Sequence, residues 1–301
     1  MRTPLFVATF VLSIFATPFA HADDAWMQSQ RQWREQRAEA LSQPDGWLSL
    51  VGLHWLAPGR HSVGKAADRD IVLSAGPDAL GEFELSEQDG VDRVRWYPPE
   101  DVVALRYNDA PVGTESIEVG ADSSDHPGVI TWSGGSVQLI ERGGKLGLRV
   151  RDAEAPTRTH FQGLAWFEPD QRWEIKARFE AKPAGSTIPI ANVLGQLEAT
   201  PNPGRVVFEI DGNRYTLEAL GDPDESLFLI VADRSNGKQT YGAGRFLYTD
   251  AVDGGEVMLD FNRMVNPPCA YNAYSTCPLP PPENRLNLSV EAGEKTYQGA
   301  H

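Results

Sequence analysis

The sequence predicts a mainly β protein, in which one N-terminal helix is followed by antiparallel β-sandwich or barrel modules. Tryptophan, glutamine and arginine side chains recur at three- and four-residue spacing in one early stretch, which is typical of a helix. After Gly46 the hydrophobic period changes to two, in short runs of β-branched and aromatic residues. Glycine, proline, aspartate and asparagine separate these runs at even intervals, which favours sandwiches and barrels.

Residues 1–22 have the layout of a secretory signal. Arg2 is followed by the apolar stretch Leu5–Phe15 and by the small residues Ala20 and Ala22, which precede a cleavage position. The apolar stretch is shorter than the roughly 20 residues that a membrane-spanning helix needs, and no later segment reaches that length. We therefore expect cleavage near Ala22, a periplasmic or secreted mature protein, and no membrane span.

A helix is expected over residues 24–41. Asp23 and Asp24 suit the positive end of its dipole, and the turn at Pro44–Gly46 ends it. The side chains that share one face are Trp26, Gln30, Trp33 and Arg37. We expect the helix to pack onto a sheet through this face.

Alternation predicts strands from Trp47 onward, and Asp211–Asn213 and Ser235–Lys238 have the composition of hairpin turns. The expected strands are Trp47–Leu56, His61–Gly64, Asp70–Leu73, Gly81–Leu85, Val91–Tyr97, Val102–Tyr107, Val129–Trp132, Ser136–Ile140, Leu146–Arg151, Arg172–Ala181, Ile188–Thr200, Arg205–Ile210, Tyr215–Leu220, Leu227–Ala232, Gly255–Phe261 and Asn284–Val290.

A change in composition divides the mature chain near Lys182. All eight tryptophans lie before it, and the later part uses phenylalanine, tyrosine and leucine instead. We expect an N-terminal helix and β module over residues 23–182 and a second β module over residues 183–301, with one continuous unit as the alternative.

The charge of the chain limits its partners. Its formal net charge is −15, and an acidic surface repels the phosphates of nucleic acids, so no nucleic-acid partner is expected. No two histidines are spaced as metal ligands, and no motif for a cofactor is found, so neither a metal nor a cofactor is expected.

The two cysteines, Cys269 and Cys277, lie eight positions apart in a proline-rich segment. In an oxidising compartment such a pair most simply forms one disulfide. The alternatives are a metal pair, for which no further ligands flank the cysteines, and a redox pair, for which the spacing is wrong. We expect a structural disulfide that staples the segment from Asn266 to Pro282.

The densest group of motifs lies at the C-terminal end, and through it the chain resembles the family called domain of unknown function 1684. The matching motifs are Gly244–Leu247, Asp260–Asn262, Asn266–Ala270, Thr276–Pro281, Glu283–Leu286 and Ala292–Lys295, with Gly52–Leu56 and Arg149–Asp152 nearer the N-terminus. The resemblance extends over nearly the whole mature chain. It implies nothing about activity, since the family is named for its unknown function.

The side chains of these motifs suggest a polar cluster. Asp260 and Asn262 share one face of a strand, because they are two residues apart. If Arg245 pairs with Asp260, a fixed ion pair lies beside the disulfide-stapled segment. Asn266, Tyr271, Tyr274, Asn284 and Glu294 complete the expected cluster. In the alternative interpretation, the same side chains only fasten an irregular loop onto the sheet, because buried backbone groups need partners.

Three functions are compatible with this cluster. The first is an exported protein that binds a small polar or sugar-like ligand through Arg245, Asn262, Asn266, Tyr271, Tyr274 and Asn284. The second is a hydrolase in which Asp260 and Glu294, or Asp233, act as acid and base. The third is a structural or interaction module without a ligand. The positions of these side chains relative to an open pocket decide between them.

Overall fold

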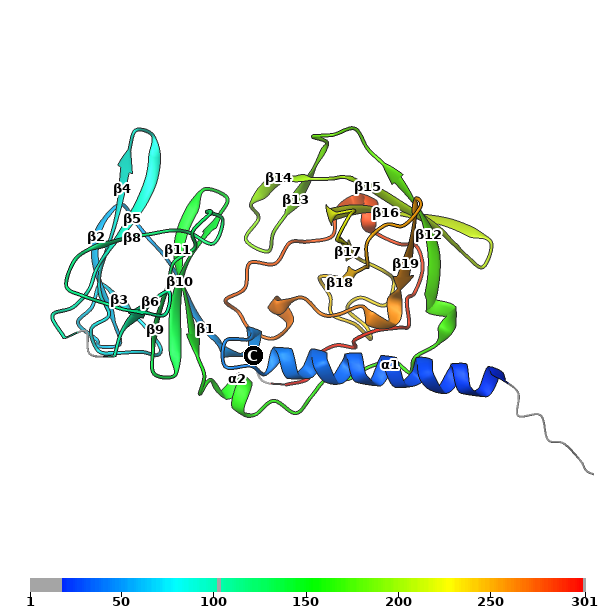
Figure 1. Cartoon of the computed structure of the whole chain (residues 1–301), viewed down its shortest axis with the longest axis horizontal. Coiled ribbons are helices and arrows are strands. Elements are labelled where there is room, and N and C mark those ends of the chain that lie inside the picture. Colours follow the sequence, from blue (N-terminus) through cyan, green and yellow to red (C-terminus); the bar gives the residue numbers. More distant parts are fainter. Residues whose placement is uncertain (1–17, 102–103, 300–301) are drawn as a thin grey trace, which may run out of the picture.

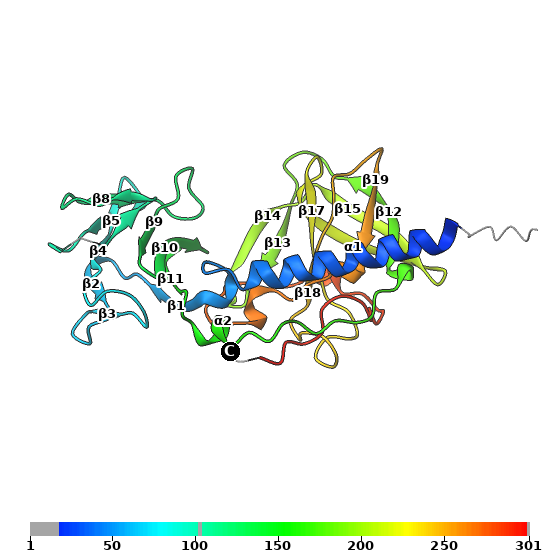
Figure 2. The ribbon, with the colours of Figure 1, turned by 60° about the horizontal axis from the view of Figure 1, so that its bottom comes forward.

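A computed structural model describes residues 18–101 and 104–299 of the chain. Two β modules lie side by side, and a long helix, α1 (Pro18–Leu41), runs beneath the second one (Figures 1 and 2). The expected signal lies mainly outside the described residues. Within them, no helix has both the length and the apolar character that crossing a bilayer requires.

The N-terminal module, residues 47–152, is a sandwich of two sheets. One sheet has the order β1 (Leu50–Trp55), β11 (Lys145–Asp152), β10 (Gly135–Arg142), β9 (Val129–Trp132), β6 (Arg106–Tyr107), β7 (Ala110–Pro111). The other has the order β3 (Ile71–Val72), β2 (Gly59–Gly64), β4 (Gly81–Gln88), β5 (Val91–Tyr97), β8 (Ile117–Val119). Alternate side chains of both sheets, such as Phe83 and Leu148, form the core between them.

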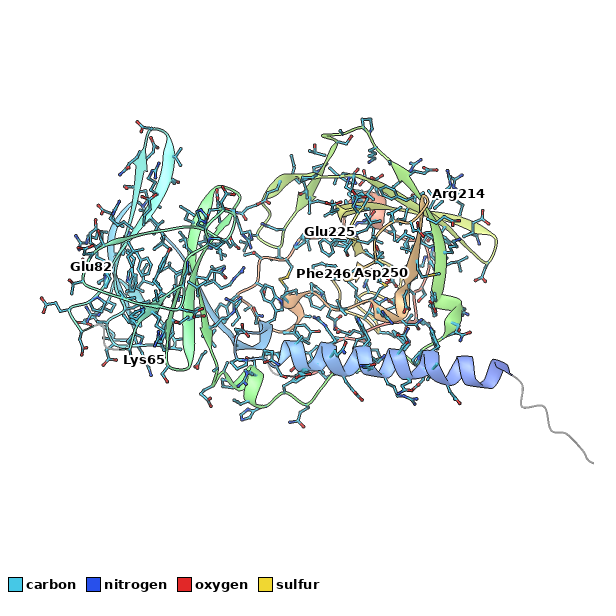
Figure 3. The ribbon with its side chains drawn as sticks, viewed as in Figure 1. Lys65, Glu82, Arg214, Glu225, Phe246 and Asp250 are labelled. Atoms are coloured by element: carbon cyan, nitrogen blue, oxygen red, sulfur yellow. A yellow bond between two sulfur atoms is a disulfide. The ribbon has the colours of Figure 1, made fainter. Side chains whose placement is uncertain are left out.

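The C-terminal module is built on one curled, six-stranded antiparallel sheet. Its order is β18 (Arg245–Tyr248), β17 (Ser226–Val231), β16 (Asn213–Asp222), β15 (Gly204–Ile210), β12 (Glu174–Ala181), β19 (Glu256–Asp260). The concave side holds a core of apolar side chains that includes Phe208, Leu229 and Phe261. Charged side chains such as Glu82 and Arg214 lie at the periphery of the molecule, whereas Phe246 lies inside (Figure 3).

The fold class and most strands agree with the sequence prediction, and several segments differ. Residues 188–200 form a hairpin of β13 (Thr187–Ala191) and β14 (Leu197–Pro201), because Gly195 takes a positive φ of 77° and Asn192 closes the turn. The segment Asn284–Val290 is not a strand. Its backbone pairs only at single points with Ala232 and Arg234, the residues that follow β17.

The second predicted hairpin turn lies in the long connection between β17 and β18, which pair antiparallel. Residues 235–240 form a compact turn, with a bridge between Asn236 and Thr240, and the next regular strand is β18. That strand was not predicted because glycines at 242 and 244 interrupt the hydrophobic pattern before it. The expected change of module near Lys182 does not coincide with a change of sheet, because β12 pairs with β15 and β19.

Helix α1 contacts the C-terminal half through the predicted face. Trp26 donates to Glu174, Gln30 donates to Asp260, Trp33 packs edge-on against Trp166, and Arg37 pairs with Glu294. The helix begins at Pro18, earlier than expected. Its contacts are mainly hydrogen bonds and ion pairs, so the helix is positioned by specific polar partners as well as by its tryptophans.

Candidate functional site

Arg245 lies in the interior, and its partner is not Asp260. Its guanidinium is fully buried and forms an ion pair of 2.9 Å with the equally buried Asp233. It also donates to the carbonyl oxygens of Val290, Ala292 and Glu294. Arg245 therefore fastens the segment after the expected strand 284–290 to β18, and the predicted Arg245–Asp260 pair does not form.

Asp260 and Asn262 do meet, but in a structural arrangement. The Asp260 carboxylate accepts from Gln30 at 2.6 Å, pairs with Arg263 at 3.1 Å, and caps the short helical turn Phe261–Arg263 through the Asn262 amide N–H. The Asn262 side chain pairs with both backbone groups of Asp170 at 3.0 Å. These residues hold α1 and the loop before β12 against the sheet.

Glu294 is the centre of a second buried network. Its carboxylate accepts from Arg37 at 3.0 Å, from the Tyr271 hydroxyl at 2.6 Å and from the Asn266 amide N–H at 2.7 Å. Burial and the adjacent Glu294 charge raise the pKa of Tyr271 well above its usual value. Burial lowers the pKa of Arg37, but Glu294 and Tyr271 outweigh that effect and raise it.

The last two expected site residues are also placed by the fold. The Asn284 amide pairs with both backbone groups of Glu218, so it continues the edge of β16. Tyr274 is partly exposed, at 39%, on the loop between the cysteines. The structure thus brings Tyr271, Asn266 and Glu294 together around Arg37, and leaves Arg245, Asp260, Asn262 and Asn284 at separate anchoring points.

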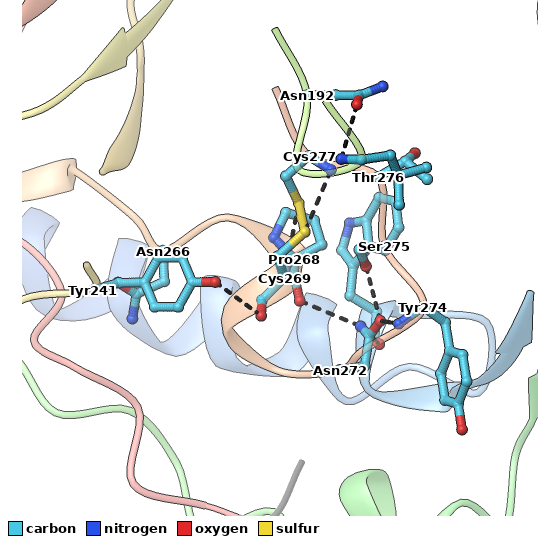
Figure 4. Close-up of a disulfide and its surroundings, with 12 residues drawn as sticks. Asn192, Tyr241, Asn266, Pro268, Cys269, Asn272, Tyr274, Ser275, Thr276 and Cys277 are labelled. Carbon is cyan, nitrogen blue, oxygen red and sulfur yellow. Dashed lines mark hydrogen bonds between the residues drawn. A yellow bond between two sulfur atoms is a disulfide. The ribbon is translucent and has the colours of Figure 1, made fainter. Parts of the chain in front are cut away.

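The expected disulfide joins Cys269 and Cys277, whose Cα atoms are 6.1 Å apart (Figure 4). The disulfide loop, residues 266–284, contacts the N-terminal module at two places. Asn272 donates to the carbonyl oxygen of Trp47 at 3.0 Å, and the Thr276 hydroxyl accepts from arginines of that module. The loop is therefore one wall between the two modules.

A pocket of about 290 Å³ opens between the modules at this wall, and we call it the inter-module pocket. The N-terminal module and α1 contribute Arg142, Arg149, Trp47 and Arg37; the outer face of the C-terminal sheet contributes Phe228, Phe246, Tyr248 and Val265; the disulfide loop contributes Asn266, Pro268, Ser275, Thr276, Cys277 and Pro278. It is thus apolar on one side and basic on the other.

Arg149, on β11, has the most unusual environment in this pocket. It is only 4% exposed, and no carboxylate of the described residues forms an ion pair with it. One Nη donates weakly to Thr276 at 3.4 Å, the Nε–H has no acceptor, and the guanidinium lies 5.6 Å from the centre of the Trp47 ring. Burial, with the nearby Arg142 and Arg151 charges, lowers the pKa of Arg149 to about 10.

The other two arginines of the pocket are neutralised. Arg142 forms a two-pronged pair with Asp122, at 2.9 and 2.7 Å, and Arg37 pairs with Glu294. No aspartate or glutamate is among the described residues that line the pocket. In a chain of net charge −15, this pocket therefore carries one uncompensated positive charge, on Arg149.

Sequence reasoning did not single out Arg149 as a site residue. It appeared only in the family motif Arg149–Asp152, and in an alternating strand its position predicts an outward-facing, solvated side chain. The face of β11 that carries Arg149 is covered because the disulfide loop packs onto it. No local sequence pattern indicates this contact. Of the residues expected to bind a ligand, Asn266 lines the pocket. No three His, Cys, Asp or Glu side chains are grouped as metal ligands in the described chain.

Comparisons with other proteins agree with the motifs of the C-terminal half. The solution NMR structure of an uncharacterized protein from Haloarcula marismortui is 31% identical over 46% of this chain and 79% of that one, with a TM-score of 0.38. Comparison with curated proteins finds no match. A family model described as protein of unknown function (DUF1684) matches residues 159–295, whereas the motifs at 52–56 and 149–152 lie outside the match. The chain belongs to this family.

Proposed function

We propose that the protein binds a small organic anion in the inter-module pocket, with Arg149 as the charged anchor. The observation that carries the proposal is the buried guanidinium of Arg149, which lines the pocket and has no carboxylate partner among the described residues. Buried charges in proteins are normally paired, because an unpaired one loses its hydration without compensation. A bound carboxylate or similar oxyanion would supply the missing charge.

The surroundings of Arg149 suit this role. The Trp47 ring packs beside the guanidinium and Thr276 contacts one of its nitrogens, so the side chain is held in place while its Nε–H stays free. A guanidinium presents N–H groups in a planar fork that matches a carboxylate. Phe228, Phe246 and Val265 offer apolar walls for the rest of the ligand.

This proposal keeps the ligand-binding hypothesis of the sequence and moves the site away from the Arg245 and Asp260 anchors. The hydrolase hypothesis gains no support, because Asp233, Asp260 and Glu294 each accept hydrogen bonds or ion pairs from their own neighbours. An exported location remains part of the proposal, and it is supported by the signal layout of residues 1–22 alone.

Calorimetric titration with a panel of small carboxylates tests the proposal. At least one acid should bind the native protein, and Arg149→Met should weaken that binding at least tenfold. Arg151→Met is the matched control. Arg151 lies two residues along the same strand, is half-buried with a lowered pKa, and does not line this pocket. Equal affinities of the native protein and Arg149→Met, or an equal loss in the Arg151 variant, would contradict the proposal.

A further inference from the structure

A second polar group in the inter-module pocket lacks a partner. Asn266 is 1% exposed and lines the pocket from the disulfide loop. Its Nδ2 donates to the carbonyl oxygen of Lys295 at 2.8 Å, whereas its Oδ1 has no hydrogen-bond partner in the part of the chain that the structure describes. The contact with Lys295 fixes the amide orientation, because a flipped amide would oppose two oxygens.

Asn266 is otherwise held firmly in place. Its backbone N–H donates to Glu294 at 2.7 Å, and its carbonyl oxygen accepts from Arg37 at 3.1 Å. Three of its four polar groups are thus bound within the protein, and the free one is an acceptor. Buried polar atoms are rarely left without partners, so this acceptor needs an explanation.

The two unpartnered groups are complementary. Arg149, from the N-terminal module, offers a donor and a positive charge, and Asn266, from the disulfide loop, offers a neutral acceptor. Arg142 and Arg37 are neutralised by Asp122 and Glu294, so the pocket matches a single negative charge. The pocket also has apolar walls, which include Phe228, Phe246 and Val265.

We infer that the ligand is a small monoanionic acid that carries a hydroxyl or N–H donor at the end away from its charge. This inference rests on the proposed function at Arg149. The acid group contacts Arg149, the donor reaches the Asn266 Oδ1, and the ligand bridges the two modules. Simple alkanoates lack the donor, and neutral sugars lack the charge, so both should bind more weakly than an acid that has both groups.

The test uses ω-hydroxyalkanoates of increasing chain length, each titrated beside its unsubstituted parent alkanoate. The flexible chains sample the separation between Arg149 and Asn266. At one chain length the hydroxyl should tighten binding to the native protein by about fivefold to tenfold, the usual effect of one added hydrogen bond. Asn266→Ala should abolish this gain.

Asn266→Ala also removes the contact with Lys295, so the ratio of affinities for each matched pair of acids is the measured quantity. A general loosening of the loop weakens both acids and cancels in that ratio. Asn272→Ala is the control. Asn272 is a buried amide of the same loop, its amide groups are bound to Trp47, Tyr274 and Ser275, and it does not line the pocket. This variant should keep the hydroxyl gain.

The outcomes separate the two proposals. If parent acids bind through Arg149 but no hydroxyl improves them at any length, the inference is overturned and the proposed function stands. A hydroxyl gain that persists in Asn266→Ala also overturns the inference. If no acid binds the native protein, or if Arg149→Met binds acids as well as the native protein does, the proposed function fails and the inference fails with it.

Discussion

Replacing Arg149 with methionine should make the protein more stable, which is unusual for a buried side chain. Methionine keeps much of the length and apolar surface of arginine and removes the charge. The same substitution at Arg245 should have the opposite effect. Both side chains are buried, at 4% and 0% exposure, and they differ in whether a carboxylate neutralises them.

The expected magnitudes follow from these environments. Burial first, and then the Arg142 and Arg151 charges, lower the pKa of Arg149 to about 10, which corresponds to about 3 kcal/mol against the charged form in the folded protein. The contact with Trp47 offsets about 0.5–2 kcal/mol of this. Arg149→Met should therefore raise the free energy of unfolding by about 1–2 kcal/mol.

Arg245→Met leaves the Asp233 carboxylate buried without its partner and frees three backbone carbonyl groups. Breaking a buried pair in this way costs about 3–5 kcal/mol. Urea unfolding of the native protein and both variants, followed by tryptophan fluorescence, measures the two effects. If Arg149→Met lowers the unfolding midpoint as much as Arg245→Met does, Arg149 is a structural anchor and the reasoning is refuted.

Further predictions concern charge, redox state and export. Asp260→Asn should lower the free energy of unfolding by about 1–3 kcal/mol and leave anion affinity unchanged, as titration and urea unfolding will show; lost affinity at unchanged stability would contradict this. Anion affinity should stay level above neutral pH and fall as pH rises through about 10, where Arg149 loses its proton, and a fall well below that pH would point to another group. Reducing the Cys269–Cys277 disulfide should weaken anion binding by about tenfold, since the loop carries one pocket wall, and titration with and without reductant measures it; equal affinities argue against that wall. Exported protein should begin at Asp23 on N-terminal sequencing, and retention of the signal would oppose cleavage.

Removal of the Arg149 proton also affects stability. Its pKa is lower in the folded than in the unfolded protein, so the unfolded chain binds more protons between about pH 10 and the ordinary arginine value. The free energy of unfolding therefore increases as pH rises through this window, because the folded protein loses its buried charge. At neutral pH the charged Arg149 only destabilises the folded protein. A bound anion offsets this destabilisation, because it favours the charged form of Arg149.

Much of the fold follows from sequence periodicity. The runs Gly81–Leu85 and Val91–Tyr97 pair as β4 and β5, because alternate residues such as Phe83 and Trp96 enter one core. Periodicity failed where a turn is apolar. The hairpin between β13 and β14 turns through Val193 and Leu194, so its two strands read as one continuous strand.

The site was harder to predict for a physical reason. The sequence draws attention to Arg245 and Asp260, but only the tertiary structure reveals that each is buried or bound among its own neighbours. Arg149 looks like an ordinary outward residue of a strand. Its importance arises because a loop more than a hundred residues later in the sequence covers it, and Thr276 of that loop contacts it across 127 positions.

A crystal structure of the protein with the tightest-binding small acid tests the central claim most directly. We expect electron density for the acid in the inter-module pocket, with its carboxylate oxygens within hydrogen-bond distance of the Arg149 Nε and Nη atoms. Density for the acid at another surface, or an Arg149 guanidinium that stays unpaired beside an occupied pocket, would contradict the account.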